Sequence, residues 1–245
     1  MKRIGIIGGM SYQSTLYYYD QINHLVNERM GGMSSADLII KSVNYEEYCE
    51  LVDKDQWARI REKLAHGAKD LAYDLGCDYI AMATNTMHKV APEVKKRVER
   101  CYGNYGNYPK FIHIGDCIAE HLRQMKARRI MLLGTEFIVT DGFMKRFLSG
   151  KYNIEVVGMR DYCHEICNID RIILDELRHG IVNPESKKYI QDFVYRFYWE
   201  SRFKPEAVVL CSTELNRLIK PGDIYLPLVD SAKAHAEKLV ELSLK

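Results

Sequence analysis

The sequence lacks the features that would tie the protein to a membrane or to nucleic acid. Across 245 residues there is no apolar run long enough to span a bilayer. The excess of positive charge is small, because 35 lysines and arginines face 33 acidic residues and leave a net charge of +2. We therefore expect neither nucleic acid nor a membrane surface as a partner.

An export signal is not expected either. The chain begins with a charged pair followed by apolar residues, but the apolar stretch is short, glycine interrupts it, and no cleavage site of small residues follows. The seven cysteines are odd in number and scattered, which fits reduced thiols better than a disulfide framework. The sequence thus predicts a soluble protein of the cytoplasm.

Signatures of the common cofactors are absent as well. The turn Gly8-Gly9-Met10-Ser11 is not Gly-x-Gly-x-x-Gly, and the chain contains no Walker sequence. No lysine stands in a convincing pyridoxal phosphate context. Cys163, His164 and Cys167 are candidate metal ligands, but the sequence has no second ligand pair with zinc spacing. We therefore expect no nucleotide cofactor, no pyridoxal phosphate and no metal.

What the sequence does contain is an alternation of short apolar runs with amphipathic stretches. The runs are rich in Ile and Val and nearly continuous, which is typical of parallel strands covered on both faces. Strands are expected at residues 3–7, 37–43, 79–83, 110–114, 129–134, 154–158 and 207–210. Helices are expected at residues 13–29, 57–75, 119–126, 143–148, 169–179, 184–202 and 232–244, with Asn183 as the cap before Pro184. This alternation predicts a doubly wound α/β fold.

The pattern also divides the chain in two. A second unit opens with the basic pair Arg128-Arg129, an apolar strand and a glycine, as the first does at Lys2-Arg3. We predict an N-terminal lobe of residues 1–115, joined by a C-terminal helix at about 228–245, and a second lobe of residues 116–227. The turn-rich segment 102–109 is expected to be a surface connection without chemistry.

Chemistry is expected where strands end, because ligands of open α/β sheets bind beyond the carboxyl ends of the strands. After the first strand, residues 8–11 lead through Ser14 and Thr15 into a helix. Glycines allow a close approach of the backbone, and a helix N-terminus offers N–H groups to an anion. The alternative is that this segment is only a tight turn.

Two further strands run into polar loops, at residues 84–88 and 211–214. Polar groups at the end of a buried strand are costly unless they are hydrogen-bonded or used. For the first loop, the alternative is that Asn85 or Thr86 caps the next helix with His88 in its first turn. For the second, it is a buried Cys211 followed by a Ser/Thr cap. A last candidate is Asp230-Ser231, which can cap the final helix, with His235 on that helix.

Together these loops resemble the aspartate/glutamate racemase family. The matching segments, which keep the family's order and span nearly the whole chain, are residues 4–10 with Ser14-Thr15, Asn85-Thr86-Met87-His88-Lys89, Thr213-Glu214-Leu215, and Asp230-Ser231 with His235-Ala236. The resemblance implies two Rossmann-like lobes with mainly parallel four-stranded sheets, an active site in the cleft between them, a homodimer and no cofactor.

The resemblance also implies a reaction. Inverting an α-carbon needs one base on each face, and the family normally uses two cysteines, placed before Asn-Thr and before Thr-Glu. A small acidic amino acid or dicarboxylate would be held by the glycine turn (Gly9, Met10, Ser11, Thr15) and by Asn85, Thr86, Thr213 and Glu214, with His88, Asp230 and His235 in support.

This sequence departs from that pattern at both cysteine positions. Thr84 takes the first and Ser212 the second, with Cys211 one residue early. A hydroxyl is a far weaker acid than a thiol. On a regular strand, neighbours point to opposite faces, so Cys211 could replace the missing thiol only if the strand end is irregular.

Three functions remain open from the sequence. The first is a cofactor-independent racemase for aspartate, glutamate or a relative, with Cys211, or Ser212 and Thr84 through a bound water, as the acid–base groups. The second is a pseudoenzyme that keeps the anion pocket and has lost turnover. The third is a decarboxylase or isomerase of the same fold that uses one thiol.

Overall fold

The structure is a computed structural model that describes residues 1–100 and 109–245. Within these residues the chain forms two compact units. The first comprises Met1–Ile114 and His235–Lys245, and the second comprises Gly115–Ala234. Most of the turn-rich segment predicted at 102–109 lies outside the described residues, so that prediction is not tested.

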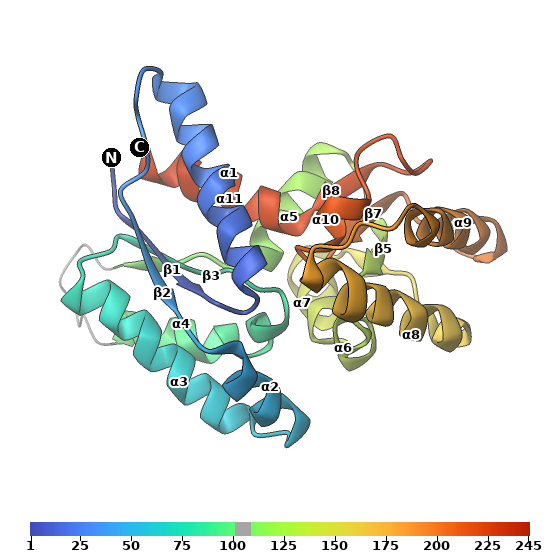
Figure 1. The fold of residues 1–245 in the computed structure, drawn as a ribbon, viewed down its shortest axis with the longest axis horizontal. Coiled ribbons are helices and arrows are strands. Elements are labelled where there is room, and N and C mark those ends of the chain that lie inside the picture. Colours follow the sequence, from blue (N-terminus) through green and yellow to red (C-terminus); the bar gives the residue numbers. More distant parts are fainter. Residues whose placement is uncertain (101–108) are drawn as a thin grey trace. The chain divides into compact units, whose positions relative to one another are not determined.

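The first unit alternates strands and helices along the chain (Figure 1). Its strands are β1 (Ile4–Gly8), β2 (Leu38–Ser42), β3 (Tyr79–Met82) and β4 (Lys110–Phe111). Its helices are α1 (Tyr12–Met30), α2 (Tyr45–Asp53), α3 (Trp57–Lys69) and α4 (Ala91–Arg100). A 3₁₀ turn, Thr86–Val90, precedes α4.

The second unit repeats this alternation. Its strands are β5 (Arg129–Leu133), β6 (Glu155–Val156), β7 (Ala207–Leu210) and β8 (Leu228–Asp230). Its helices are α5 (Ile114–Gln124), α6 (Glu136–Asp141), α7 (Phe143–Tyr152), α8 (Cys163–Arg171), α9 (Pro184–Glu200) and α10 (Leu215–Leu218). The last helix, α11 (Ser231–Ser243), begins in the second unit and continues into the first.

The described strands form two four-stranded sheets, in the orders β2-β1-β3-β4 and β6-β5-β7-β8. Every strand pairing in both sheets is parallel. The central strands β1 and β3 are aligned so that Ile4 lies beside Tyr79. The predicted α/β class with two similar, parallel four-stranded sheets is therefore confirmed.

Each sheet is buried by helices, as its apolar strands require. In the first unit, α1 lies on one face of the sheet while α3 and α4 lie on the other (Figure 1). Ile7, Ile80 and Met82 share a hydrophobic cluster with Leu64 of α3 and Val94 of α4. In the second unit, the corresponding cluster joins strand residues to helices α8 and α9, and includes Met131, Leu133, Val208, Ile166, Phe193 and Phe197. These cores fix the strand ends in place.

Several boundaries differ from the predicted ones. β8, for which no strand was predicted, has three residues and pairs with β7, so Leu228–Asp230 belongs to the second sheet rather than to the helix that joins the first lobe. β4 and β6 are shorter than predicted, with two residues each. The N-terminus of α9 is as predicted, because the Asn183 side chain accepts a hydrogen bond from the Glu185 amide. None of the helices in the described residues is long and apolar enough to cross a membrane.

Candidate active site at the strand ends

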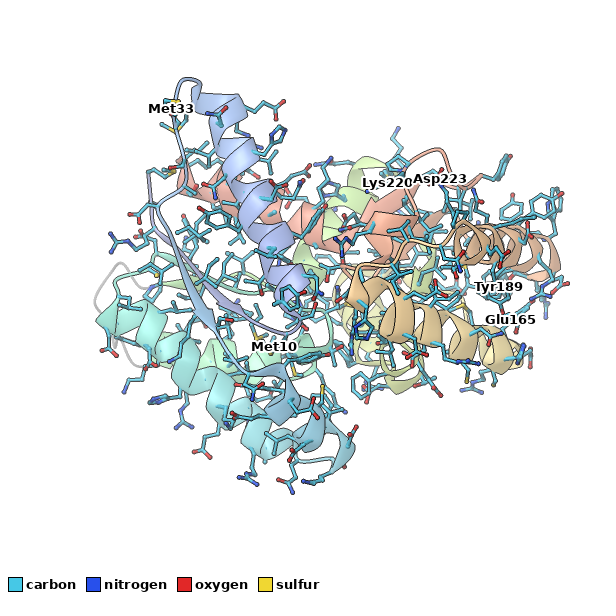
Figure 2. All side chains as sticks on the ribbon, viewed as in Figure 1. Met10, Met33, Glu165, Tyr189, Lys220 and Asp223 are labelled. Carbon is cyan, nitrogen blue, oxygen red and sulfur yellow. The ribbon has the colours of Figure 1, made fainter. Side chains whose placement is uncertain are left out.

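The glycine turn after β1 is held by close backbone contact. Gly9 has φ +93°, and a Cβ built on it would lie 2.2 Å from the carbonyl oxygen of Val43, which follows β2. Only glycine combines this left-handed conformation with such an approach. Met10, the next residue, is buried in the hydrophobic cluster of the first unit (Figure 2). The turn is therefore a rigid feature of the sheet edge.

Thr15 and Ser14 use their hydroxyls within the protein. Thr15 Oγ1 accepts a hydrogen bond of 2.7 Å from the Gly9 amide and donates one of 3.1 Å to the Ser11 carbonyl. Ser14 Oγ donates at 2.7 Å to the carbonyl of Ala83, which follows β3. Ser11 caps α1 by accepting from the Ser14 amide. These bonds tie the glycine turn to the loop after β3.

The loop after β3 buries its polar side chains. Thr84, Asn85 and His88 are all buried, and the side chain of Asn85 makes no capping hydrogen bond to the following 3₁₀ turn. Thr86, one residue further, is half-buried. The alternative in which Asn85 is a helix cap is therefore wrong, because the chain turns through a 3₁₀ segment before α4 begins.

The side chain of His88 bonds back to the start of this loop. Its Nδ1 is 2.7 Å from the Thr84 carbonyl oxygen, and a carbonyl only accepts, so Nδ1 carries the proton. Its Nε2 is buried with no hydrogen-bond partner among the described residues. Burial, and then the neighbouring His113 and His235, hold the pKa of His88 well below 6.5. His88 is thus a neutral imidazole at neutral pH.

His113 and His235 complete a buried cluster with His88. Ring centroids of His88 lie 4.7 Å from His113 and 5.7 Å from His235. His235 Nε2 lies 3.0 Å from the Ile112 carbonyl, so it donates there, and its Nδ1 accepts from the Tyr18 hydroxyl at 2.9 Å. His235 therefore fastens α11 to α1 and to the end of β4, in support of the loop.

In the second unit, the loop after β7 carries a hydroxyl–carboxylate pair. Ser212 Oγ donates a hydrogen bond of 2.7 Å to Glu214 Oε2, and Thr213 Oγ1 lies 3.3 Å from the same oxygen. Each of these three residues is only 7% exposed. The carboxylate of Glu214 is thus aimed at the hydroxyls that precede it.

Cys211 occupies a different environment from Ser212. Its amide donates to the Leu133 carbonyl, which extends the β5–β7 ladder, and its side chain is buried. Burial, with a smaller contribution from Asp230, raises the pKa of the Cys211 thiol to about 12. A thiol in this state is almost wholly protonated at neutral pH.

Asp230 ends β8 and begins the last helix. Its Oδ1 accepts hydrogen bonds from the amides of Ala232 and Lys233, so it is the cap of α11. Its Oδ2 accepts from the side-chain amide of Asn216 at 3.1 Å. This contact ties the cap to α10, the helix that follows the Ser212 loop.

The residues predicted from the sequence fall into two groups, one in each unit. The glycine turn, the loop at 84–88 and His235 lie in the first unit, while Cys211–Glu214 and Asp230 lie in the second. Three contributors were missed: Tyr18, His113 and Asn216. His113 lies two residues after β4, but within the longer strand predicted at 110–114, so the strand-end rule did not find it. No group of three metal-ligating side chains is placed to hold an ion in residues 1–100 and 109–245.

Two α/β units with parallel sheets, each with buried polar side chains where its central strands end, define an α/β protein with enzyme-like strand-end sites. Comparison with known proteins identifies the family. A family model described as Asp/Glu/Hydantoin racemase matches residues 7–239. The chain belongs to this family, as its resemblance indicated, and the family's racemases place it among the isomerases.

Individual relatives agree. The solved structure of an aspartate racemase homologue from Pyrococcus horikoshii is 33% identical, with a TM-score of 0.84 and all of both chains covered. The aspartate racemase of Picrophilus torridus is 21% identical with a TM-score of 0.72, covering 100% of this chain and 95% of its own. The broad specificity amino-acid racemase RacX of Bacillus subtilis is 22% identical over 98% of both chains.

Proposed function

We propose that the protein is a cofactor-independent amino-acid racemase that acts on aspartate, glutamate or a related dicarboxylate by proton transfer at Cα. Its family membership and its racemase relatives support the reaction class. The observation that carries the proposal is the burial of hydroxyl, amide and carboxylate side chains at the ends of β3 and β7, where the family places its acid–base groups. Such groups are costly to bury unless they are hydrogen-bonded or used.

In this proposal Thr84 and Ser212, which stand at the two positions where the family carries its cysteines, would be the acid–base groups. The N–H groups of the turn after β1 and the side chains of Asn85 and Thr86 would hold a carboxylate. Thr15 would shape that turn rather than bind the substrate, because both of its hydroxyl bonds are made within the loop.

Exchange of the Cα hydrogen in D2O is the direct test. Each enantiomer of aspartate and glutamate is incubated with the protein, and loss of the Cα–H signal is followed by NMR. We expect exchange with at least one acidic amino acid, and its loss in Thr84→Ala and Ser212→Ala. No exchange with any acidic amino acid would contradict the proposed racemase.

The second candidate is a pseudoenzyme that binds a dicarboxylate without turning it over. The replacement of both usual cysteines by Thr84 and Ser212 favours it. Calorimetry would then show binding of aspartate or glutamate by the unmodified protein without exchange, and Thr84→Cys with Ser212→Cys would create exchange. Exchange by the unmodified protein counts against this candidate.

A one-thiol decarboxylase or isomerase would depend on Cys211. The burial of this side chain and the rise of its pKa to about 12 do not support a one-thiol decarboxylase or isomerase. Alkylation that abolishes turnover of an arylmalonate or maleate, but not of amino acids, would support it nonetheless.

We further propose that the protein works as a cytoplasmic homodimer. A stripe of exposed apolar side chains along α1, formed by Tyr12, Leu16 and Tyr19, offers a surface for self-association. Analytical ultracentrifugation of the unmodified protein and of Leu16→Glu tests it. A monomer at all concentrations in the unmodified protein would rule the dimer out.

A further inference from the structure

A serine hydroxyl is a poor acid–base group by itself. Its proton is held far more tightly than that of a thiol, whose pKa is about 8.5. A serine that takes part in proton transfer therefore needs a neighbouring group that accepts its proton. The question at Ser212 is whether the protein supplies such a group.

Glu214 meets the geometric requirement. The 2.7 Å between Ser212 Oγ and Glu214 Oε2 is the ordinary length of a hydroxyl–carboxylate hydrogen bond. Thr213 Oγ1 approaches the same oxygen at 3.3 Å, which leaves that oxygen occupied by hydroxyls. All three side chains are buried, so water competes little for the carboxylate.

The adjacent groups are engaged elsewhere. The Asp230 carboxylate accepts from the start of α11 and from Asn216. Cys211 is buried in the strand, with its amide bound to Leu133. Around Thr84, the described hydrogen bonds show no carboxylate, and the His88 ring bonds to the main-chain carbonyl. Of the two polar loops at residues 84–88 and 211–214, only the second shows a hydroxyl–carboxylate pair among the described hydrogen bonds.

We propose that Glu214 is the proton acceptor of the second loop, acting through the Ser212 hydroxyl, so that the pair takes the place of the family's thiol. This inference rests on the racemase function proposed above. It changes the role of Glu214 from a substrate ligand to a residue that activates and positions Ser212. The negative charge of Glu214 would repel the carboxylates of the substrate. This repulsion also argues against Glu214 as a ligand of those carboxylates.

The proton transfer balances within this set of groups. The Cα–H bond of the substrate breaks, and its electron pair stays on the substrate and spreads into the α-carboxylate. The proton passes to Ser212 Oγ while the hydroxyl proton of Ser212 passes to Glu214 Oε2. The reverse steps return a proton to Cα. No oxidant, reductant or further reactant is needed.

Glu214→Gln is the central test. Glutamine keeps the size of the side chain and can accept the Ser212 hydrogen bond, but its amide does not take the proton. We expect kcat for Cα–H exchange to fall about a hundredfold or more while KM changes less than about threefold. In Ser212→Cys/Glu214→Gln the thiol does not need the carboxylate, and we expect exchange at least about tenfold faster than in Glu214→Gln.

The second unit offers a matched control. Ser186 Oγ donates to Glu176 at 2.9 and 2.7 Å, which is another hydroxyl–carboxylate pair remote in sequence from the strand-end loops. Glu176→Gln removes the same kind of charge and we expect it to leave exchange unchanged. Thermal unfolding of both Gln variants shows whether they are folded.

The outcomes separate this inference from the proposed function. Exchange by the unmodified protein that is unchanged in Glu214→Gln, or that falls only through KM, would overturn the role of Glu214 and leave the racemase standing. A loss that Ser212→Cys does not restore would also overturn it. If the unmodified protein exchanges no acidic amino acid, the proposed function fails, and the role of the pair fails with it.

Discussion

His88 Nδ1 donates a hydrogen bond of 2.7 Å to the carbonyl oxygen of Thr84, four residues earlier in the chain. The bond fixes the tautomer of the ring and the path of the loop that carries Thr84. It also places an imidazole in a fully buried site beside two other histidines, where a positive charge would be poorly solvated.

Stability should therefore depend on pH through His88. Its pKa is well below 6.5 in the folded protein and close to 6.5 when unfolded, so the unfolded chain binds more protons as the pH falls. The stability from this group is complete above about pH 6.5 and is lost below it, by up to about 1.4 kcal/mol per pH unit. Urea unfolding between pH 8 and pH 5 measures this slope.

The variant His88→Gln should flatten the slope, whereas His24→Gln, which changes an exposed histidine, should leave it unaltered. A slope that is the same in His88→Gln and in the unmodified protein would show that His88 does not cause the acid sensitivity.

Substitutions at Gly9 and Gly31 distinguish the effect of backbone strain on stability from that of a steric clash. Gly9 and Gly31 both have positive φ, but a Cβ on Gly9 meets Val43 backbone atoms at 2.2 and 2.6 Å, while Gly31 has no atom within 4 Å. We expect Gly31→Ala to lower the free energy of unfolding by about 1 kcal/mol, and Gly9→Ala by about 3 kcal/mol or more. Equal losses in chemical denaturation would mean that the turn at Gly9 can open to accept a side chain.

The thiols should differ sharply in reactivity. Cys163 is exposed, whereas Cys211 is buried and its pKa is raised to about 12. Iodoacetamide at pH 8 should modify Cys163 of the folded protein within minutes and leave Cys211 intact, as read by peptide mass spectrometry. Cys211→Ala should retain Cα exchange. Rapid labelling of Cys211 together with loss of Cα exchange would instead support a mechanism in which Cys211 is the acid–base group.

Asp230 should act mainly as a helix cap. Its Oδ1 accepts from two amides at the start of α11, and Asn caps helices as well as Asp does. Asp230→Ala should lower the free energy of unfolding by about 1–2 kcal/mol, and Asp230→Asn by less. Asn183→Ala, which removes the cap of α9, provides the matched comparison. If Asp230→Asn costs as much as Asp230→Ala, the charge matters more than the cap.

The sequence by itself determined the fold class and indicated the strand-end loops as the candidate site. Apolar runs such as Ala207–Leu210 predict buried parallel strands, and the polar residues that follow must then lie at the carboxyl edge of a sheet. The same reasoning missed β8, because three residues are too few to show a period, and it did not find α4, whose start follows a 3₁₀ turn.

Only the tertiary structure decided what each polar group does. Cys211 and Ser212 are neighbours at a strand end, and adjacent strand residues point to opposite faces. Both side chains are buried, but the Ser212 hydroxyl bonds to Glu214, whereas burial raises the pKa of the Cys211 thiol to about 12. Asn216, Tyr18 and His113 contact residues of the candidate site from other segments of the chain, and no local pattern of residues encodes these contacts.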